Sequence, residues 1–355
     1  HCLEVIRFID LHFLTLQEKI AAFDHLGQWL RRHEFQPDST EYASLNEVIR
    51  QAFHQNGWFT EDEVIHALRY WAKVLTEQEI SKWTGEYGIN KTTPQRVGLI
   101  LAGNIPLVGL HDIFCVLLSG HRAIIKHSSS DPVLTGELLR QLMIIEPRFS
   151  DFIKVVDGQM KDIDAIIATG SNNSARHFED YFGHLPKIIR KNRTSVALLK
   201  GSENQDELHG LCEDAFRYFG LGCRNVTKIF VPRGYDLNAI FQASLPFEYL
   251  MANKKFANNY TYYKTLLMME QRNILENGLV LLVEDDRLYS PVSVLNYEFY
   301  DSMNDAEKRI EEQRDSIQCV VGSIDVPFGS AQNPSLNTFA DGVDTLSFLV
   351  SLGGK

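Results

Sequence analysis

The stretch VGLILAGNIPLVGLHDIFCVLLSGHRAIIK, residues 97–126, decides the fold of this chain. An apolar run is followed by a turn, then by an apolar segment from Pro106 to Gly120, and then by a second apolar run that ends at Lys126. Proline near a helix start and glycine at a helix end are typical helix boundaries. Strands that alternate with a helix in this way are typical of a βαβ unit in a parallel sheet. The stretch therefore predicts an α/β fold and places Asn104 in the loop after the first strand.

The segment KHSSSDP, residues 126–132, follows the second predicted strand. It combines the basic side chain of Lys126 with the hydroxyls of Ser128 and Ser129 at the point where the strand ends. Basic and hydroxyl groups suit contacts with a ribose or a phosphate. Taken alone, the segment is more typical of a capped helix start, so its interpretation depends on the motifs around it.

A second strand-then-helix pattern follows in DAIIATGSNNSARHFEDYF, residues 164–182. The apolar run predicts a strand over Asp164–Ala168, and the residues after it predict a helix over Ser174–Phe182. Gly170 and Ser171 lie between them, at the N-terminal end of the helix. Helix N-termini present unpaired N–H groups and the positive end of the helix dipole. This position is therefore a candidate site for a pyrophosphate.

Cys223 lies in the segment AFRYFGLGCRNVTKIFVP, residues 215–232. Apolar spacing predicts a helix over Asp206–Phe219 and a strand over Val226–Val231, which leaves Cys223 in a turn bounded by glycines. A thiol ionises more readily than a hydroxyl and can hold an acyl group as a thioester. The amide of Asn104 and the backbone N–H of Cys223 are candidates for an oxyanion hole. The alternative is that Cys223 is an inert core residue, as free cysteines commonly are.

Composition favours an intracellular enzyme of ordinary size. The chain has 355 residues and 44% hydrophobic content, enough to build two compact lobes. It contains no apolar run long enough to span a bilayer, and the first twenty residues do not read as a secretory signal. We therefore expect a cytoplasmic protein without an integral membrane segment.

The net charge and the spacing of the cysteines limit the ligands and partners that we expect. The net charge of −11 argues against a nucleic-acid surface, so an anionic cofactor needs local basic groups. The candidates are Lys126, Arg190, Lys191 and Arg193. The five cysteines are widely spaced and form no metal-binding pattern, so we expect reduced thiols and no bound metal.

The region before the βαβ unit, residues 14–86, predicts several amphipathic helices, because its apolar residues recur at intervals of three and four. We expect these helices to pack on the neighbouring lobe. Their aromatic residues are candidates for an acyl channel, although aromatic residues at helical spacing are more often part of the core. They are Trp58, Tyr70, Trp71 and Trp83.

Four motifs occur in a characteristic order. They are AGNIP at 102–106, KHSSSDP at 126–132, ATGSNNSA at 168–175 and GLGC at 220–223. In this order they resemble the aldehyde dehydrogenase superfamily, and most closely its fatty acyl-CoA reductase branch, which includes the bacterial luminescence reductase subunit. The resemblance runs from about residue 97 to the end of the chain, including the tail at 328–350. It implies two Rossmann-like three-layer lobes.

The resemblance also implies roles for individual residues. Asn104 corresponds to the asparagine that completes the oxyanion hole, and Cys223 to the nucleophile. Lys126 corresponds to the lysine that contacts the adenosine ribose. Gly170 and Ser171 correspond to the residues beside the cofactor phosphates.

Three departures from the superfamily pattern refine this interpretation. Hydrolytic relatives carry a glutamate in the strand region before the nucleophile, near Ile189 here, but residues 187–200 contain no carboxylate. A thioester on Cys223 would therefore lack the base that activates water. Ser129 stands where NAD-preferring relatives often carry a glutamate, which favours NADPH over NADH. The sequence SPV at 290–292 replaces the glutamate and phenylalanine expected near the nicotinamide ribose.

Together these features predict an enzyme that reduces an acyl-CoA to an aldehyde with NADPH through a thioester on Cys223. The alternatives are a coenzyme-A-independent aldehyde dehydrogenase, a cysteine-dependent acyltransferase or thioesterase without a redox cofactor, and a non-catalytic protein on the same fold. A second copy of the chain or an acyl-transfer protein is the expected protein partner. We expect a helical region at 1–90, an NAD(P)-binding lobe at 91–190, a catalytic lobe at 191–285, and a segment at 286–355 that completes both lobes.

Overall fold

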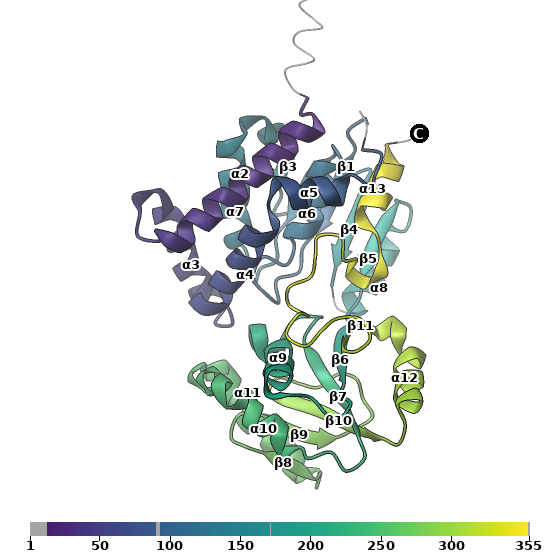
Figure 1. Cartoon of the computed structure of the whole chain (residues 1–355). Coiled ribbons are helices and arrows are strands. Elements are labelled where there is room, and N and C mark those ends of the chain that lie inside the picture. Colours follow the sequence, from purple (N-terminus) through teal and green to yellow (C-terminus); the bar gives the residue numbers. More distant parts are fainter. Residues whose placement is uncertain (1–12, 90–92, 171, 354–355) are drawn as a thin grey trace, which may run out of the picture. The chain divides into compact units, whose positions relative to one another are not determined.

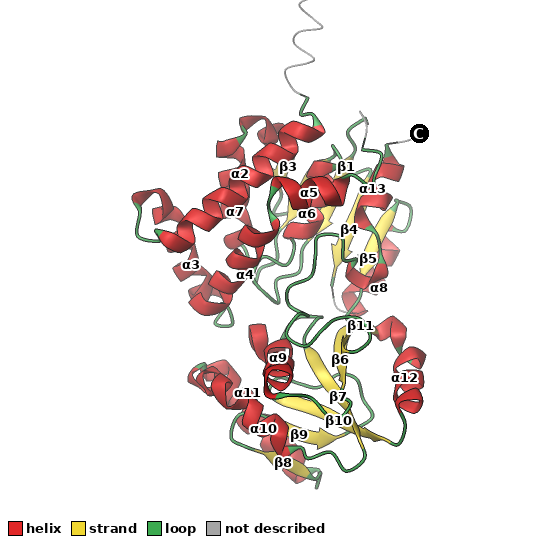
Figure 2. Cartoon of the chain, in the orientation of Figure 1, coloured by secondary structure: helices red, strands yellow, loops and turns green. Residues whose placement is uncertain are grey.

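The computed structural model describes residues 13–89, 93–170 and 172–353, and these residues form two compact units (Figure 1). Unit 1 contains the described residues up to Lys191 together with those from Ser335 onward. Unit 2 is the continuous stretch Asn192–Pro334. In each unit a mostly or wholly parallel sheet is covered by helices on both faces (Figure 2). This arrangement confirms the predicted α/β class with two three-layer lobes.

The sheet of unit 1 has five parallel strands among the described residues, in the order β3-β2-β1-β4-β5. The first strand pairs with β2 on one side and with β4 on the other. The point where the strand order reverses therefore lies between β1 and β4, which is where open α/β sheets bind ligands at the carboxyl ends of their strands. The strands are β1 (Arg96–Ile100), β2 (Arg122–Lys126), β3 (Ile153–Val155), β4 (Ala165–Thr169) and β5 (Lys187–Arg190).

Three crossover helices connect these strands: α6 (Leu110–Leu118), α7 (Leu134–Ile145) and α8 (Asn172–Phe182). Right-handed crossovers place α6 and α7 on one face of the sheet and α8 on the other (Figure 1). On the α8 face, Phe178 and Phe182 pack with Ile124 and Ile166 of the strands. The βαβ unit predicted for residues 97–126 is thus present, although its helix begins at Leu110 and not at Pro106, because residues 106–109 form a turn.

The N-terminal helices pack on the face of unit 1 that carries α6. The ring of Phe23 lies 4.6 Å from that of Phe114 in α6, and the ring of Trp71 lies 5.1 Å from the same side chain. Trp71 and Trp83 are each only 5% exposed, so both pack in the core, and a role for the aromatic residues in an acyl channel stays a prediction. The helices are α2 (Leu16–Phe35), α3 (Ala43–Gln55), α4 (Glu61–Val74) and α5 (Glu77–Thr84).

The sheet of unit 2 has six strands among the described residues, in the order β11-β6-β7-β10-β9-β8. All neighbouring strands run parallel except β8 and β9, which are antiparallel. The strands are β6 (Thr194–Leu198), β7 (Val226–Pro232), β8 (Ile274–Glu276), β9 (Leu281–Glu284), β10 (Val294–Tyr300) and β11 (Ile317–Gly322).

Helices also cover both faces of this second sheet. One face carries α9 (Gln205–Phe216), α10 (Asn238–Ser244) and α11 (Lys254–Met269), and the other carries α12 (Met303–Glu312) (Figure 1). Beneath α12, Ala306 and Ile310 pack on Phe230 and Tyr300. The connection from β6 through α9 to β7 carries Cys223, so unit 2 positions the candidate nucleophile.

The end of the described chain returns to unit 1. Helix α13 (Thr345–Leu352) lies against α6, and the ring of His121 hydrogen-bonds the Leu349 carbonyl oxygen with Nε2 2.8 Å away. Unit 1 is therefore built from two stretches of sequence that are separated by the whole of unit 2.

Candidate active site

Cys223 lies in the turn between the end of α9 and the start of β7, where the sequence placed it. Its side chain is exposed. The N–H of Asn225 donates to the carbonyl oxygen of Gly222 at 3.0 Å, which closes a tight turn around Cys223. The thiol is therefore presented to solvent from a closed loop at the amino end of β7.

The other cysteines that the structure describes are buried. Burial raises the pKa of the Cys115 and Cys319 thiols, and it raises the pKa of Cys212 to about 12. A thiol with a raised pKa holds little nucleophilic thiolate at neutral pH. Among the described cysteines, Cys223 is therefore the one suited by exposure to react with a substrate.

Asn225 holds the Cys223 turn against the end of α9. Its side chain is fully buried, and its Oδ1 accepts a hydrogen bond from the Gly222 N–H at 2.7 Å. Its Nδ2 donates to the carbonyl oxygens of Asp214 at 2.9 Å and Arg217 at 2.8 Å, with Ala215 also in range at 3.3 Å. The last carbonyl groups of a helix have no hydrogen-bond partner within the helix. The Asn225 amide supplies such a partner at the end of α9 and also binds the Cys223 turn.

The other side of the turn is held by Ser195 of β6. The buried hydroxyl of Ser195 donates to the Cys223 carbonyl oxygen at 3.1 Å. The Ser195 hydroxyl oxygen also lies 3.2 Å from the Cys319 sulfur of β11. The residue before Cys223 and the carbonyl of Cys223 itself are thus both fixed by buried side chains.

The chain reverses between α9 and this turn through three consecutive left-handed residues. The φ angles are +54° at Tyr218, +56° at Phe219 and +75° at Gly220. Each non-glycine residue in this region costs on the order of 1–2 kcal/mol. Both aromatic side chains are buried, and their burial offsets that cost. The predicted helix over Asp206–Phe219 is therefore wrong in its last three residues.

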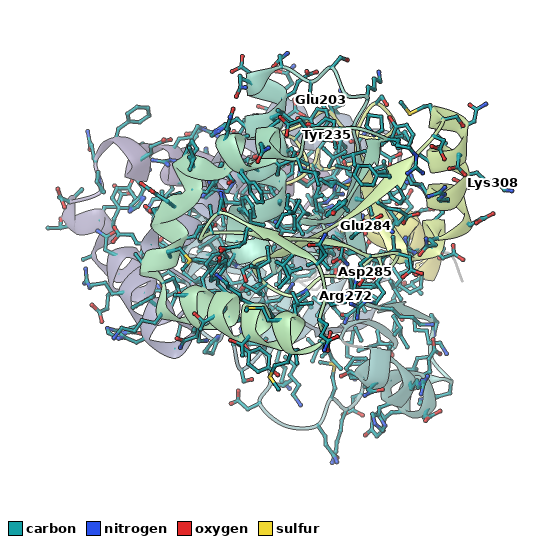
Figure 3. The ribbon with its side chains drawn as sticks, turned by 90° about the horizontal axis from the view of Figure 1, so that it is seen from below. Glu203, Tyr235, Arg272, Glu284, Asp285 and Lys308 are labelled. Carbon is teal, nitrogen blue, oxygen red and sulfur yellow. The ribbon has the colours of Figure 1, made fainter. Side chains whose placement is uncertain are left out.

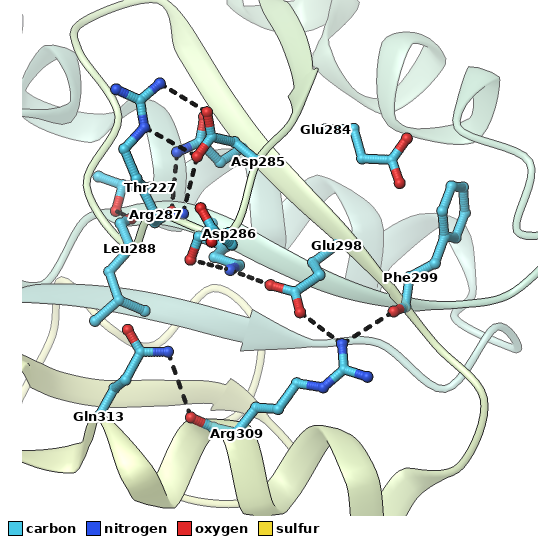
Figure 4. A network of polar contacts seen from close by, with 12 residues as sticks. Thr227, Glu284, Asp285, Asp286, Arg287, Leu288, Glu298, Phe299, Arg309 and Gln313 are labelled. Atoms are coloured by element: carbon cyan, nitrogen blue, oxygen red, sulfur yellow. Dashed lines mark hydrogen bonds and ion pairs between the residues drawn. The ribbon is translucent and has the colours of Figure 1, made fainter.

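A charge network around the buried Lys228 side chain holds β7 in place (Figure 4). Lys228 is fully buried, forms an ion pair with Glu298 of β10, and donates to the Asp286 carbonyl oxygen at 2.7 Å. Arg309 of α12 donates to the second oxygen of Glu298 at 2.5 Å. The carboxylate and the carbonyl thus satisfy a buried cation, as a charge in the interior requires. The network fixes the strand that begins directly after the Cys223 turn.

A cavity of about 410 Å³ opens at the other end of β7, with Lys200, Glu203 and Tyr235 in its lining (Figure 3). Its residues follow the carboxyl ends of β6 and β7, whereas Cys223 precedes β7. The Glu203 carboxylate accepts the N–H groups of Lys200 at 2.5 Å and Gly201 at 3.0 Å, so this loop satisfies its own amides. The cavity is therefore separate from the surroundings of the reactive thiol.

In unit 1, the remaining candidate residues follow the carboxyl ends of three neighbouring strands. Asn104 follows β1, Lys126 ends β2 and is followed by Ser128 and Ser129, and Gly170 follows β4. The side chains of Asn104 and Ser129 are exposed. The strand order β2-β1-β4 brings these positions to one edge of the sheet. Ser171 lies outside the described residues.

Close backbone approaches shape this edge. A Cβ on Gly103 would lie 2.5 Å from the Ser128 Oγ, so the loops after β1 and β2 touch at this glycine. A Cβ on Gly170 would lie 2.8 Å from the Ser174 Cβ, which keeps the start of α8 close to β4. Both glycines are therefore required by the packing of these loops, because a side chain at either position would collide with Ser128 or Ser174.

A buried carboxyl group fixes the loop that contains Asn104. Asp131 accepts hydrogen bonds from the Leu107 N–H at 3.3 Å and from the Leu134 N–H at 3.2 Å. Leu107 is itself left-handed, with φ +60°. Burial raises the pKa of Asp131 to about 6. The aspartate of the KHSSSDP motif therefore ties the loop after β1 to the start of α7.

Arg190 was a candidate for binding the cofactor, and His127 is the second basic residue of the KHSSSDP motif. Arg190 is buried and pairs with Asp112, Nη2 to Oδ1 at 2.7 Å, while its Nη1 donates to the Ala340 carbonyl oxygen at 2.8 Å. It is therefore a structural residue and does not face a cofactor. Burial lowers the pKa of His127, and Asp157 opposes this only in part. The positive charge at the end of β2 therefore comes from Lys126.

Asn104 belongs to unit 1 and Cys223 to unit 2, so their meeting in one oxyanion hole stays a prediction. Sequence reasoning missed Asn225 and Asp214, which hold the thiol turn and its surroundings. Asn225 lies in the quoted segment, two residues after Cys223, and this closeness was the sequence feature that could have indicated its role.

Among the described residues, no group of three or more histidines, cysteines or carboxylates is arranged to hold a metal ion. No helix in the described ranges is long and apolar enough to cross a membrane.

Residues 77–239 match the family model described as Acyl-CoA reductase (LuxC). This match includes Asn104, Lys126 and Cys223. No curated protein matches the chain by sequence. The match confirms the resemblance to the acyl-CoA reductase branch, and it supports oxidoreductase chemistry of the aldehyde dehydrogenase type.

Solved structures of aldehyde dehydrogenases share the fold. The Mycobacterium tuberculosis aldehyde dehydrogenase complexed with NAD+ matches with a TM-score of 0.60 and 16% identity, over 88% of this chain and 74% of that chain. Aldehyde dehydrogenase 21 from Physcomitrella patens, in complex with the reaction product succinate, matches with a TM-score of 0.65 and 11% identity. That match covers 97% of this chain and 85% of the other. The chain therefore has the aldehyde dehydrogenase fold.

Proposed function

We propose that this protein reduces an acyl-CoA thioester to the aldehyde, with NADPH as the reductant and Cys223 as the nucleophile. The observation that carries the proposal is the exposed Cys223, which lies on a turn held by hydrogen bonds from the buried Asn225 side chain. This turn lies within the segment that matches the acyl-CoA reductase family model. The absence of a carboxylate from residues 187–200 supports reduction over hydrolysis, because no base in this stretch would activate water.

In the proposed reaction, the Cys223 sulfur attacks the thioester carbonyl and the carbon–sulfur bond to coenzyme A breaks. Asn104 and the Cys223 N–H would donate to the oxyanion that forms in this step. The enzyme thioester on Cys223 would receive a hydride from a bound nicotinamide and a proton from solvent, which gives a thiohemiacetal. Collapse of the thiohemiacetal releases the aldehyde and returns the thiol of Cys223.

The residues at the carboxyl edge of unit 1 fit a dinucleotide. Lys126 and the hydroxyls of Ser128 and Ser129 would bind the adenosine ribose and a 2′-phosphate, since they combine a positive charge with neutral donors. Gly170 and the start of α8 would receive the pyrophosphate, because a helix N-terminus presents unpaired N–H groups to an anion. Ser129 in place of a glutamate favours NADPH, since it removes a charge that repels the 2′-phosphate.

Intact-mass spectrometry tests the covalent step. Incubation with an acyl-CoA and without NADPH should add one acyl group, and Cys223→Ala should abolish the adduct. Cys212→Ala is the matched control, because Cys212 is buried in the neighbouring helix, and it should keep the adduct. An adduct that persists in Cys223→Ala contradicts the assignment of the nucleophile.

Spectrophotometry tests the redox step. NADPH oxidation should depend on the acyl-CoA and should release an aldehyde in equal amount. An adduct on Cys223 without NADPH oxidation would favour an acyltransferase or thioesterase, and oxidation of free aldehydes without coenzyme A would favour an ordinary aldehyde dehydrogenase.

A further inference from the structure

The side chain of Asn225 joins the Cys223 turn to the end of α9. It lies two residues after Cys223, is fully buried, and uses both ends of its amide. Its oxygen accepts from the residue directly before Cys223, and its nitrogen donates to carbonyls at the end of α9. A carboxylate cannot replace this group, since it has no N–H, and an apolar residue can replace neither end.

The end of α9, to which Asn225 binds, is itself held by hydrogen bonds to another loop. The Asp214 carbonyl oxygen, which accepts from the Asn225 Nδ2, also accepts from the Gln332 Nε2 at 3.2 Å. The Asp214 carboxylate accepts the N–H groups of Gly329 at 2.7 Å and Ala331 at 2.9 Å. Helix α9, the loop at 329–331 and the Cys223 turn are thus joined through buried hydrogen bonds.

We infer that Asn225 is a positioning residue for the reaction: it orients the Cys223 thiol for attack on a thioester carbonyl without touching the substrate. The inference rests on the proposed function. A thiol on a turn that moves by about 1 Å loses the alignment on which catalysis depends, at a cost of roughly a hundredfold. Ser195, which holds the carbonyl of Cys223 from the opposite side, contributes in the same way with a single hydrogen bond.

The test compares acylation with simple alkylation in Asn225→Asp, which keeps the shape of the side chain and removes its donors. The rate constant for acylation by an acyl-CoA should fall at least tenfold, because this step needs an aligned thiol. Alkylation of Cys223 by iodoacetamide should change by less than threefold, because a small reagent needs only an accessible thiol. The KM for acyl-CoA and the Kd for NADPH should stay within twofold.

Asn296→Asp is the matched control. Asn296 is also buried in unit 2, and its Nδ2 donates to the carbonyl oxygens of Arg287 at 3.0 Å and Tyr289 at 3.3 Å, away from the Cys223 turn. The control makes the same chemical change and adds the same charge. It should lower the melting temperature as Asn225→Asp does and leave the acylation rate constant unchanged.

Ser195→Ala serves as the second variant if Asn225→Asp fails to fold, and it should lower the acylation rate constant about threefold to tenfold. Wild-type acylation rates in the folded variants would overturn the inference, as would an equal loss of acylation and alkylation or an equal loss in Asn296→Asp. Absence of any acylation in the wild-type protein would overturn the proposed function, so the two failures are distinguishable.

Discussion

Asn104 occupies the loop after β1 that Asp131 holds in place. If its amide is one of two donors to the oxyanion, Asn104→Ala should lower turnover by roughly a hundredfold or more. NADPH affinity should change little, because the residue would act on the acyl group. Steady-state kinetics and a fluorescence titration with NADPH measure the two effects. Near-normal turnover would show that Asn104 serves only the loop before α6.

Ser129 tests the choice of cofactor. A glutamate at this position would accept hydrogen bonds from a free ribose and would repel a 2′-phosphate, so Ser129→Glu should weaken NADPH more than NADH. The preference should shift by about 1–3 kcal/mol at contact distance and intermediate dielectric. Because burial lowers the pKa of His127, Lys126 would supply the attraction for the 2′-phosphate.

The ratio of kcat/KM for the two cofactors, measured at fixed ionic strength, checks this expectation, since phosphate contacts are sensitive to salt. An unchanged ratio in Ser129→Glu, or a wild-type preference for NADH, would mean that Ser129 does not face the ribose.

The raised pKa of the buried Asp214 should make the stability of unit 2 depend on pH. Burial raises its pKa to about 7, against the opposing effect of the amides at 329–331, from the ordinary value of 3.8. Between these values the folded protein keeps the proton and the unfolded chain has released it. The free energy of unfolding should therefore fall as the pH rises from about 4 to about 7, by at most about 1.4 kcal/mol per pH unit, and then level off.

Denaturant titrations of the wild type and of Asp214→Asn across this pH range isolate the contribution. The difference between the two free energies of unfolding should shrink or reverse as the pH rises. A difference that is constant from pH 4 to pH 8 would show that Asp214 titrates normally.

At the scale of elements, α9 and the loop at 328–331 approach backbone to backbone. A Cβ on Gly210 would lie 2.8 Å from the Gly329 nitrogen and 2.9 Å from the Phe328 carbonyl carbon. Backbone cannot yield as a flexible side chain does, so Gly210→Ala should destabilise the protein by about 1–3 kcal/mol. Chemical denaturation measures the change.

Gly136→Ala is the matched control for this prediction, since Gly136 lies in α7 and a Cβ there would meet nothing within 4 Å. This variant should stabilise the protein by about 0.4–1 kcal/mol, because alanine restricts the unfolded chain. Equal effects of the two substitutions would contradict the close approach at Gly210.

Helices and strands with regularly spaced apolar residues were predictable from the sequence, but the connection between α9 and β7 that carries Cys223 was not. The run at 97–126 repeats apolar residues with the periods of strand and helix, and the structure contains that unit. The residues after α9 differ from this pattern. Tyr218 and Phe219 continue the apolar spacing of the helix, but their φ angles are left-handed, so the helix has already ended. Hydrophobic spacing reports which residues are buried, and it carries no signal for the sign of φ.

Long-range pairing explains the other differences. Arg190 suited an anion site by residue type, yet its partner Asp112 lies 78 positions earlier and the Ala340 carbonyl 150 positions later. Asn225 likewise acts through backbone carbonyls that no residue type encodes. The chemistry expected of Cys223, Asn104 and Ser129 comes from local motifs and stays a prediction, whereas the contacts that hold the Cys223 turn and the Asn104 loop depend on the fold.

At the scale of the whole molecule, Arg190 anchors the returning segment to unit 1. It pairs with Asp112 and donates to the Ala340 carbonyl oxygen and the Thr345 hydroxyl, each at 2.8 Å. Arg190→Leu leaves a buried carboxylate without its cation, so it should destabilise unit 1 by about 3–5 kcal/mol. Hydrogen exchange followed by mass spectrometry should show lost protection at 340–352, with unit 2 unaffected.

Arg96→Leu is the control within the same unit, because its pair with Asp164 is exposed and exposed pairs contribute little. Protection at 340–352 should match the wild type in this variant. Normal protection in Arg190→Leu would show that the returning segment is held by its apolar contacts alone.

The return of residues 335–352 to unit 1 also fixes an order of events during translation. A ribosome delivers the strands of unit 1 first, then the whole of unit 2, and only afterwards the segment that supplies Ala340 and Thr345 to Arg190. Unit 2 is continuous in sequence, so it can complete its sheet while unit 1 still waits for its last helix. The nascent chain therefore passes through a stage in which all of unit 2 has been synthesised and the Arg190–Asp112 pair still lacks its contacts with Ala340 and Thr345.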